Sequence, residues 1–166
     1  MPGEYGDVYG TWSFDRLNGQ GYIAETAYGL GGKREYDGCA AIYGYENTTE
    51  SSRLSLNAFD EAVTDSFAFA FSMYYDMTED ASVYLLARYS DGGEARIADL
   101  KCADSGKWNN YTMDFDADRG TCRIYLNGSA VSEAAFDGGI ITDFAFEFMS
   151  SGFEDMYAVD NVSLIY

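Results

Sequence analysis

The chain has 166 residues, 47% of them hydrophobic, which is enough for one domain with a single substantial core. Ten Lys and Arg against 28 Asp and Glu give a formal charge of −18, and such a field repels nucleic acid and anionic membrane surfaces. The absence of histidine excludes Ser-His-Asp and Cys-His catalysis and histidine-ligated zinc. We therefore expect a single domain over residues 1–166, with neither nucleic acid nor membrane as a partner.

Alternation of apolar and polar residues, the pattern of β-strands, runs through most of the chain. In chain order it predicts strands near residues 11–15, 35–45, 52–59, 66–73, 82–90, 94–102, 107–116, 121–127, 129–136, 140–148 and 156–166. Within them, Phe67, Phe69 and Phe71 share one face of a strand, and Phe144, Phe146 and Phe148 share one face of another. We expect these two Phe rows to be buried together.

Short segments rich in Gly, Asn and Asp separate these strands, as in Asn127-Gly128 and Asp91-Gly92-Gly93. No segment has a helical period. Many short strands joined by tight turns predict an all-β protein, with two antiparallel sheets packed as a sandwich around the Phe rows.

Three cysteines stand at positions 39, 102 and 122, without CxxC spacing. One disulfide with a free thiol and three buried thiols both fit this set. The sequence favours buried thiols, because each cysteine lies in an alternating strand among apolar neighbours.

The segment 107–131 contains a strand that begins with Trp, an acidic turn with Gly, and a second strand that ends in Asn-Gly. A strand over residues 140–146 follows, and residues 157–166 close the chain with an Asp-Asn-Val motif. This order resembles the concanavalin A-like (LamG-like) jelly roll, and the ending resembles bacterial modules attached to polysaccharide-degrading enzymes. The resemblance covers residues 65–166, and residues 1–64 by strand count alone.

This resemblance implies a jelly-roll β-sandwich that serves as a non-catalytic carbohydrate-binding module. It also implies a polysaccharide as the partner, and a monomeric domain of a larger secreted or cell-surface bacterial protein.

In modules of this kind an acid of the last strand often joins N-terminal acids around a structural calcium ion. The resemblance therefore implies a Ca²⁺ site with Asp160, Asp15 and Glu4 as ligands, and Asp7 is a further N-terminal candidate. Carboxylate oxygens suit calcium, and this acidic chain has many. The alternative for Asp160 is a strand acid that hydrogen-bonds to neighbouring backbone.

A second acidic segment, Asp114–Gly120, has acids at alternate positions like the first half of a calcium loop. Its Gly comes one place late for an EF-hand, and Tyr125 stands where the loop needs Glu. Alternation directs Met113 and Phe115 inward and the acids outward. We therefore interpret this segment as a solvated hairpin end.

Catalysis has little support from the sequence. Jelly-roll glucanases carry a Glu-x-Asp-x-(x)-Glu strand, which places two carboxylates on one face, and neither Glu147 nor Glu154 stands in such a pattern. Polysaccharide lyases of this fold use histidine, which is missing here. A small glycoside hydrolase or polysaccharide lyase stays as an alternative, through a carboxylate pair that folding brings together.

Sugar binding needs aromatic rings for the pyranose faces and polar groups for the hydroxyls. The 15 tyrosines supply rings, and the small residues that alternate with Phe over 66–72 leave room for a chain molecule. The predicted groove is lined by Tyr43, Tyr45, Tyr74, Tyr84, Arg88 and Arg96. Its predicted ligand is a neutral β-linked plant polysaccharide. The alternatives are tyrosines that merely cap the sheet edges, and a structural or adhesive domain that binds protein.

Overall fold

The computed structural model describes residues 5–7, 10–15, 20–24, 39–43, 52–57, 66–102, 104–136, 140–149 and 155–165. For the strands before residue 53, it describes the backbone alone. Within these residues no helix is long and apolar enough to cross a membrane.

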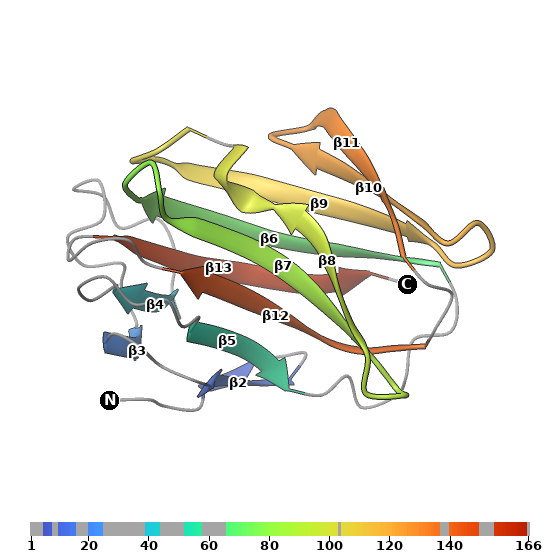
Figure 1. The fold of residues 1–166 in the computed structure, drawn as a ribbon, viewed down its shortest axis with the longest axis horizontal. Helices are drawn as coiled ribbons and strands as arrows, with labels where there is room; N and C mark the ends of the chain where they lie inside the picture. Colours follow the sequence, from blue (N-terminus) through green and yellow to red (C-terminus); the bar gives the residue numbers. More distant parts are fainter. Residues whose placement is uncertain are drawn as a thin grey trace.

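Two antiparallel sheets form the molecule (Figure 1). The first has six strands in the order β1-β2-β5-β12-β7-β8. Their bounds are β1 Tyr5–Asp7, β2 Gly10–Asp15, β5 Ser52–Asn57, β7 Ser82–Tyr89, β8 Glu94–Asp99 and β12 Ile141–Met149.

The second sheet has seven strands in the order β11-β10-β9-β6-β13-β4-β3. Their bounds are β3 Gln20–Ala24, β4 Cys39–Tyr43, β6 Phe67–Asp76, β9 Trp108–Asp116, β10 Thr121–Leu126, β11 Ser129–Ala135 and β13 Met156–Ile165. Figure 1 shows β10 and β11 together at one edge of the molecule. The predicted all-β sandwich of two antiparallel sheets is confirmed.

The two Phe rows meet between the sheets, as predicted. All six rings are buried, none more than 7% exposed. Phe69 of β6 stacks on Phe144 of β12 with ring centroids 4.3 Å apart, and Phe71 meets Phe146 edge to face at 5.0 Å. Burial of each such ring is worth about 1.5–3 kcal/mol, so the rows hold the sheets face to face.

Turn chemistry fixes the hairpins of the seven-stranded sheet. Asn127 and Gly128 both have positive φ, 50° and 84°, the conformation that a two-residue hairpin turn requires. Gly120 ends the turn between β9 and β10 with φ of 62°, and a Cβ there would lie 3.0 Å from the carbonyl oxygen of Phe136. These two turns set the register of β9, β10 and β11.

Three local features differ from the sequence expectation. The strands β1 and β3 were not predicted. The strand predicted over residues 94–102 ends at Asp99, and Leu100–Cys102 forms a short 3-10 helix, η1. In β13, Asn161 has φ of 52° at a bulge in the pairing with β6, so Val162 returns to the core instead of facing outward.

Candidate functional site

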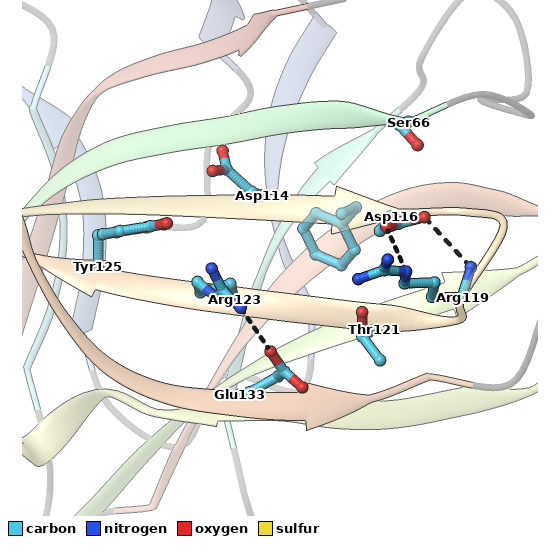
Figure 2. Close-up of a pocket in the computed structure, with 9 residues that line it drawn as sticks. Ser66, Asp114, Asp116, Arg119, Thr121, Arg123, Tyr125 and Glu133 are labelled. Carbon is cyan, nitrogen blue, oxygen red and sulfur yellow. Dashed lines mark hydrogen bonds and ion pairs between the residues drawn. The ribbon is translucent and has the colours of Figure 1, made fainter.

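A hollow of about 430 Å³ lies over strands β9, β10 and β11 of the seven-stranded sheet (Figure 2). The residues that line it are acids, arginines, hydroxyl residues, one tyrosine and one phenylalanine: Ser66, Asp114, Phe115, Asp116, Arg119, Thr121, Arg123, Tyr125 and Glu133.

Strand alternation directs the polar residues of this hollow to the outer face. On β9, Asp114 and Asp116 alternate with the buried Met113 and Phe115. On β10 the outward positions are Thr121, Arg123 and Tyr125, which alternate with buried Cys122 and Ile124. The registers bring Asp114 opposite Arg123 and Arg123 opposite Glu133, so three neighbouring strands contribute to one row.

Two arginines of the hollow are paired with acids. Arg123 donates to Glu133 at 3.3 Å, and Arg119 lies 3.7 Å from Asp116. The hydroxyl of Tyr125 and then the carboxylate of Glu133 raise the pKa of Arg123 above its ordinary value. Each of the two guanidinium groups therefore has an acidic neighbour.

Asp114 differs from the other acids of the hollow. It makes no hydrogen bond or ion pair with any residue that the structure describes, and its side chain is exposed. Asp116, by contrast, accepts a hydrogen bond from the backbone N–H of Arg119 at 3.1 Å and is fixed by the turn. Asp114 is thus an exposed carboxylate of this site whose oxygens are both free to accept hydrogen bonds, as far as the described residues show.

The hollow has the chemistry that a sugar needs. Carboxylates accept hydrogen bonds from hydroxyl groups, guanidinium groups donate to ring and hydroxyl oxygens, and a tyrosine ring offers an apolar face. Three acids against two arginines leave one excess negative charge among the lining residues.

The described residues of the predicted Tyr groove lie on two different sheets. Tyr74 does face outward from β6, as predicted, but it is only 5% exposed and its ring lies 6.0 Å from that of Trp108. Tyr43 ends β4 opposite Met156 and its side chain lies outside the described residues, as does Tyr45. Tyr74 therefore offers little surface to a ligand.

The other predicted groove residues lie on the other sheet. Tyr84 and Arg88 belong to β7 and Arg96 to β8, and they face outward from the six-stranded sheet. The guanidinium of Arg96 covers the Tyr84 ring at 4.4 Å from its centroid. Because the Phe core separates the two outer faces, these residues cannot line one groove with Tyr74.

Arg88 and Arg96 belong to a network of ion pairs on the outer face of the six-stranded sheet. Its contacts are Arg53–Glu94 at 2.7 Å, Arg53–Glu147 at 3.1 Å, Arg96–Glu147 at 2.8 Å, Arg88–Glu94 at 3.6 Å and Arg88–Asp143 at 3.7 Å. Burial alone would raise the pKa of Glu147, but hydrogen bonds from Arg96 and Arg53 outweigh it and lower that pKa. Arg88 and Arg96 therefore form ion pairs on the outer face of the six-stranded sheet, whereas the sequence predicted that they would contact a ligand.

Of the predicted calcium ligands, the structure describes the side chain of Asp160 alone. Asp160 faces outward from β13 in the seven-stranded sheet, whereas Asp15 ends β2 in the six-stranded sheet, and Glu4 lies outside the described residues. The Asp160 side chain is buried and accepts a hydrogen bond from the Asn161 N–H at 2.8 Å. Over the described part of the chain, no three acidic or thiol side chains form a metal-binding group.

Cys122 lies beneath the hollow as a free, buried thiol. Burial, assisted by the charge of Asp114, raises its pKa to about 12, so it stays protonated at neutral pH. Its predicted burial is confirmed, and it takes no part in a disulfide. The Cys39 and Cys102 side chains lie outside the described residues.

Sequence reasoning assigned the hairpin end to solvent and so missed every residue of the hollow except Ser66, which it placed on the small-residue face. A signal was present: Arg123 stands in an alternating strand between two strands with acids at outward positions. The small residues Ala68 and Ala70 of β6 pair with Asp114 and Thr112, so that face does adjoin the hollow.

No family model and no curated protein matches the sequence. Solved structures, by contrast, are similar to this chain. The carbohydrate-binding module CBM66 from Bacillus subtilis is 14% identical with a TM-score of 0.57, and the match covers 96% of this chain and 98% of that one. The Emp47p carbohydrate recognition domain is 9% identical with a TM-score of 0.58, covering 93% and 87%.

A sialidase gives a TM-score of 0.60 at 9% identity, where the match covers 97% of this chain and 16% of the sialidase. Likeness at such low identity shows the fold and leaves the ligand open. The chain therefore has the concanavalin A-like jelly-roll fold that its turns and Phe rows indicate.

Proposed function

We propose that this chain is a carbohydrate-binding module whose ligand occupies the hollow over β9, β10 and β11. The observation that carries the proposal is the lining of that hollow, where Tyr125, Asp114 and Arg123 offer a ring, a free acceptor and a donor on one outer face. The fold supports it, since similar structures are described as lectin or carbohydrate recognition domains.

The proposed ligand is a neutral β-linked polysaccharide of the kind found in plant cell walls. A net charge of −18 and an excess of acids in the hollow both disfavour polyanionic sugars. The proposed site differs from the predicted Tyr groove, because Tyr74 is buried and Tyr84 is covered by Arg96.

The proposed module is non-catalytic. Glu147 has both carboxylate oxygens bound by arginines, and Asp155 is fully buried and accepts hydrogen bonds from Thr78, so neither is available as a catalytic acid or base. We further propose that it acts outside the cell as part of a larger bacterial protein, with polysaccharide as its partner.

The deciding experiment is affinity electrophoresis of the purified chain through gels that contain glucan, xylan, mannan, alginate or polygalacturonate. We expect retardation by at least one neutral polysaccharide, with weak affinity in the micromolar to millimolar range, about −4 to −8 kcal/mol. Release of reducing sugar from the same panel would indicate a glycanase or lyase instead. Absence of retardation in every gel would favour a structural or adhesive domain.

Calcium stays a separate proposal that rests on Asp160 and on the resemblance of the last strand. An ion that binds only the folded state raises the melting temperature as its concentration rises. The proposal expects a higher melting temperature in millimolar calcium than in chelator, and loss of that difference in Asp160→Ala. Equal melting of the wild-type chain in both conditions would reject it.

A further inference from the structure

The side chain of Lys101 ends among backbone carbonyl oxygens of the turn that joins β6 to β7. Its Nζ atom donates to the oxygen of Thr78 at 2.9 Å, of Glu79 at 2.9 Å and of Ala81 at 2.6 Å. A lysine ammonium has three N–H donors and no acceptor. Each donor therefore has a carbonyl partner within a single four-residue turn.

Both sides of this contact are held in place by other bonds. The backbone N–H of Lys101 donates to Asp99 at 3.0 Å, and its carbonyl accepts from the Tyr75 hydroxyl at 3.2 Å. On the side of the turn, the N–H and hydroxyl of Thr78 donate to Asp155, which is fully buried. The Ala81 N–H closes the turn on the Thr78 carbonyl at 3.2 Å. The two ends of the turn, at Thr78 and Ala81, are thus held by contacts that do not involve the ammonium.

Converging backbone carbonyls are the ligands with which proteins hold hard cations, and neutral oxygens suit a monovalent ion of low charge density. The exposed carboxylates of Glu79 and Asp80 stand in the same turn and add negative potential. We infer that the turn over residues 78–81 is a site for a monovalent cation, and that the Lys101 ammonium is its built-in occupant.

In the wild-type chain the cation is covalently attached, so this end of the sandwich has its cation at every salt composition. An external ion of similar size, such as potassium or ammonium, would enter only after the Lys101 side chain has been removed.

The test is a chemical-rescue experiment on Lys101→Ala. Melting temperatures are measured in choline chloride, and then with ammonium, methylammonium or potassium chloride replacing choline at constant ionic strength. The matched control is Lys107→Ala, because Lys107 has the same charge, is exposed, and pairs through its ammonium with no described residue other than Asp104. Lys101→Met keeps the length of the side chain without its charge.

We expect Lys101→Ala to melt about 4–8 °C below Lys107→Ala in choline chloride, because hydrogen bonds to a charged group are lost. Ammonium or potassium should restore at least half of this difference in Lys101→Ala and little in Lys101→Met, whose methyl group fills the site. The wild-type chain and Lys107→Ala should respond equally little to the choice of cation.

Two results would overturn the inference. One is a Lys101→Ala protein as stable as Lys107→Ala. The other is a loss that none of the cations reverses, since the carbonyl groups would then hold lysine without forming a cation site. Should Lys101→Ala fail to fold, Lys101→Arg carries the test: the retained charge should preserve stability, and a loss equal to that of Lys101→Met would count against the inference.

Discussion

The two outer faces of the sandwich use similar residue types in opposite ways. On the six-stranded sheet, three arginines are paired with three acids, and Arg96 covers the Tyr84 ring. On the seven-stranded sheet, Arg119 and Arg123 are paired with acids at the sides of a hollow, while Asp114 has no partner among the described residues. On the first face the charged groups are engaged with one another, whereas the second face leaves an exposed carboxylate that the proposed sugar ligand would use.

Residue type alone therefore does not identify a binding surface. An aromatic ring next to an arginine is available to a sugar only if the arginine does not already cover it. Substitutions in the core and on each outer face can test this contrast.

The first prediction concerns the core between the two sheets, on which both outer faces depend. Phe69 is fully buried and stacks on Phe144. Phe69→Ala should lower the free energy of unfolding by about 3–5 kcal/mol, measured by denaturant titration. Val131→Ala, at a position 47% exposed, is the control and should change it by less than about 0.5 kcal/mol. Similar losses in the two variants would contradict the assignment of the core.

The Phe rows could be predicted from sequence because burial and strand alternation have the same period. The spacing of Phe67, Phe69 and Phe71 places them on one face of a strand, whichever strand is its neighbour. The turn at Asn127-Gly128 was equally readable, since few residue pairs accept two successive positive φ values.

The candidate site could not be read in the same way. Whether Tyr84 and Arg96 face a ligand or each other depends on the register between β7 and β8, which no local pattern contains. The same holds for Arg123, whose neighbours Asp114 and Glu133 come from two other strands. Tyr74 faced outward as predicted, but its contact with Trp108 is tertiary.

The second prediction concerns the ion network of the six-stranded sheet. Arg96 and Arg53 hold the pKa of Glu147 below its ordinary value despite burial. A depressed folded-state pKa means that the carboxylate stabilises the fold above its unfolded pKa, about 4.3, and that this stability is lost as pH falls through the folded pKa.

Glu147→Gln should therefore cost about 1–3 kcal/mol at pH 7 and markedly less in acid, because the stability that the wild-type carboxylate adds decreases once the pH is below its unfolded-state pKa. Denaturant titrations at pH 7 and at pH 3 measure the difference. Asp118→Asn removes the same charge from an exposed turn position and should change the free energy of unfolding by less than about 0.5 kcal/mol. A cost for Glu147→Gln that does not change with pH would show that the ion pairs contribute no stability.

The third prediction compares one tyrosine from each face. Tyr125→Ala should weaken binding to the retained polysaccharide about tenfold, equivalent to about 1.4 kcal/mol, because the ring lines the hollow. Tyr84→Ala should leave binding unchanged, since its ring is covered by Arg96 on the other sheet. Affinity electrophoresis measures both variants, and melting curves confirm that each is folded. The reverse ranking would place the ligand on the six-stranded sheet.

The smallest expected effect is one of selectivity, and it isolates the free carboxylate of the hollow. Asp114→Asn removes the excess negative charge there, whereas Asp118→Asn makes the same change at an exposed turn position outside the lining. Exposed charge pairs are worth about 0.2–1 kcal/mol, so Asp114→Asn should bind polygalacturonate or alginate about two- to fivefold better relative to a neutral glucan.

Asp118→Asn should not change the ratio of binding to acidic and neutral polysaccharides. Its charge lies in the solvated turn, so it contributes only to the overall charge of the protein. Raising the salt concentration should remove the advantage of Asp114→Asn, since screening weakens interactions between exposed charges. Equal shifts in the two variants would assign the selectivity to the overall charge of −18. Stronger binding of the wild-type chain to the acidic polysaccharides would leave sugar binding intact and refute the role given to Asp114.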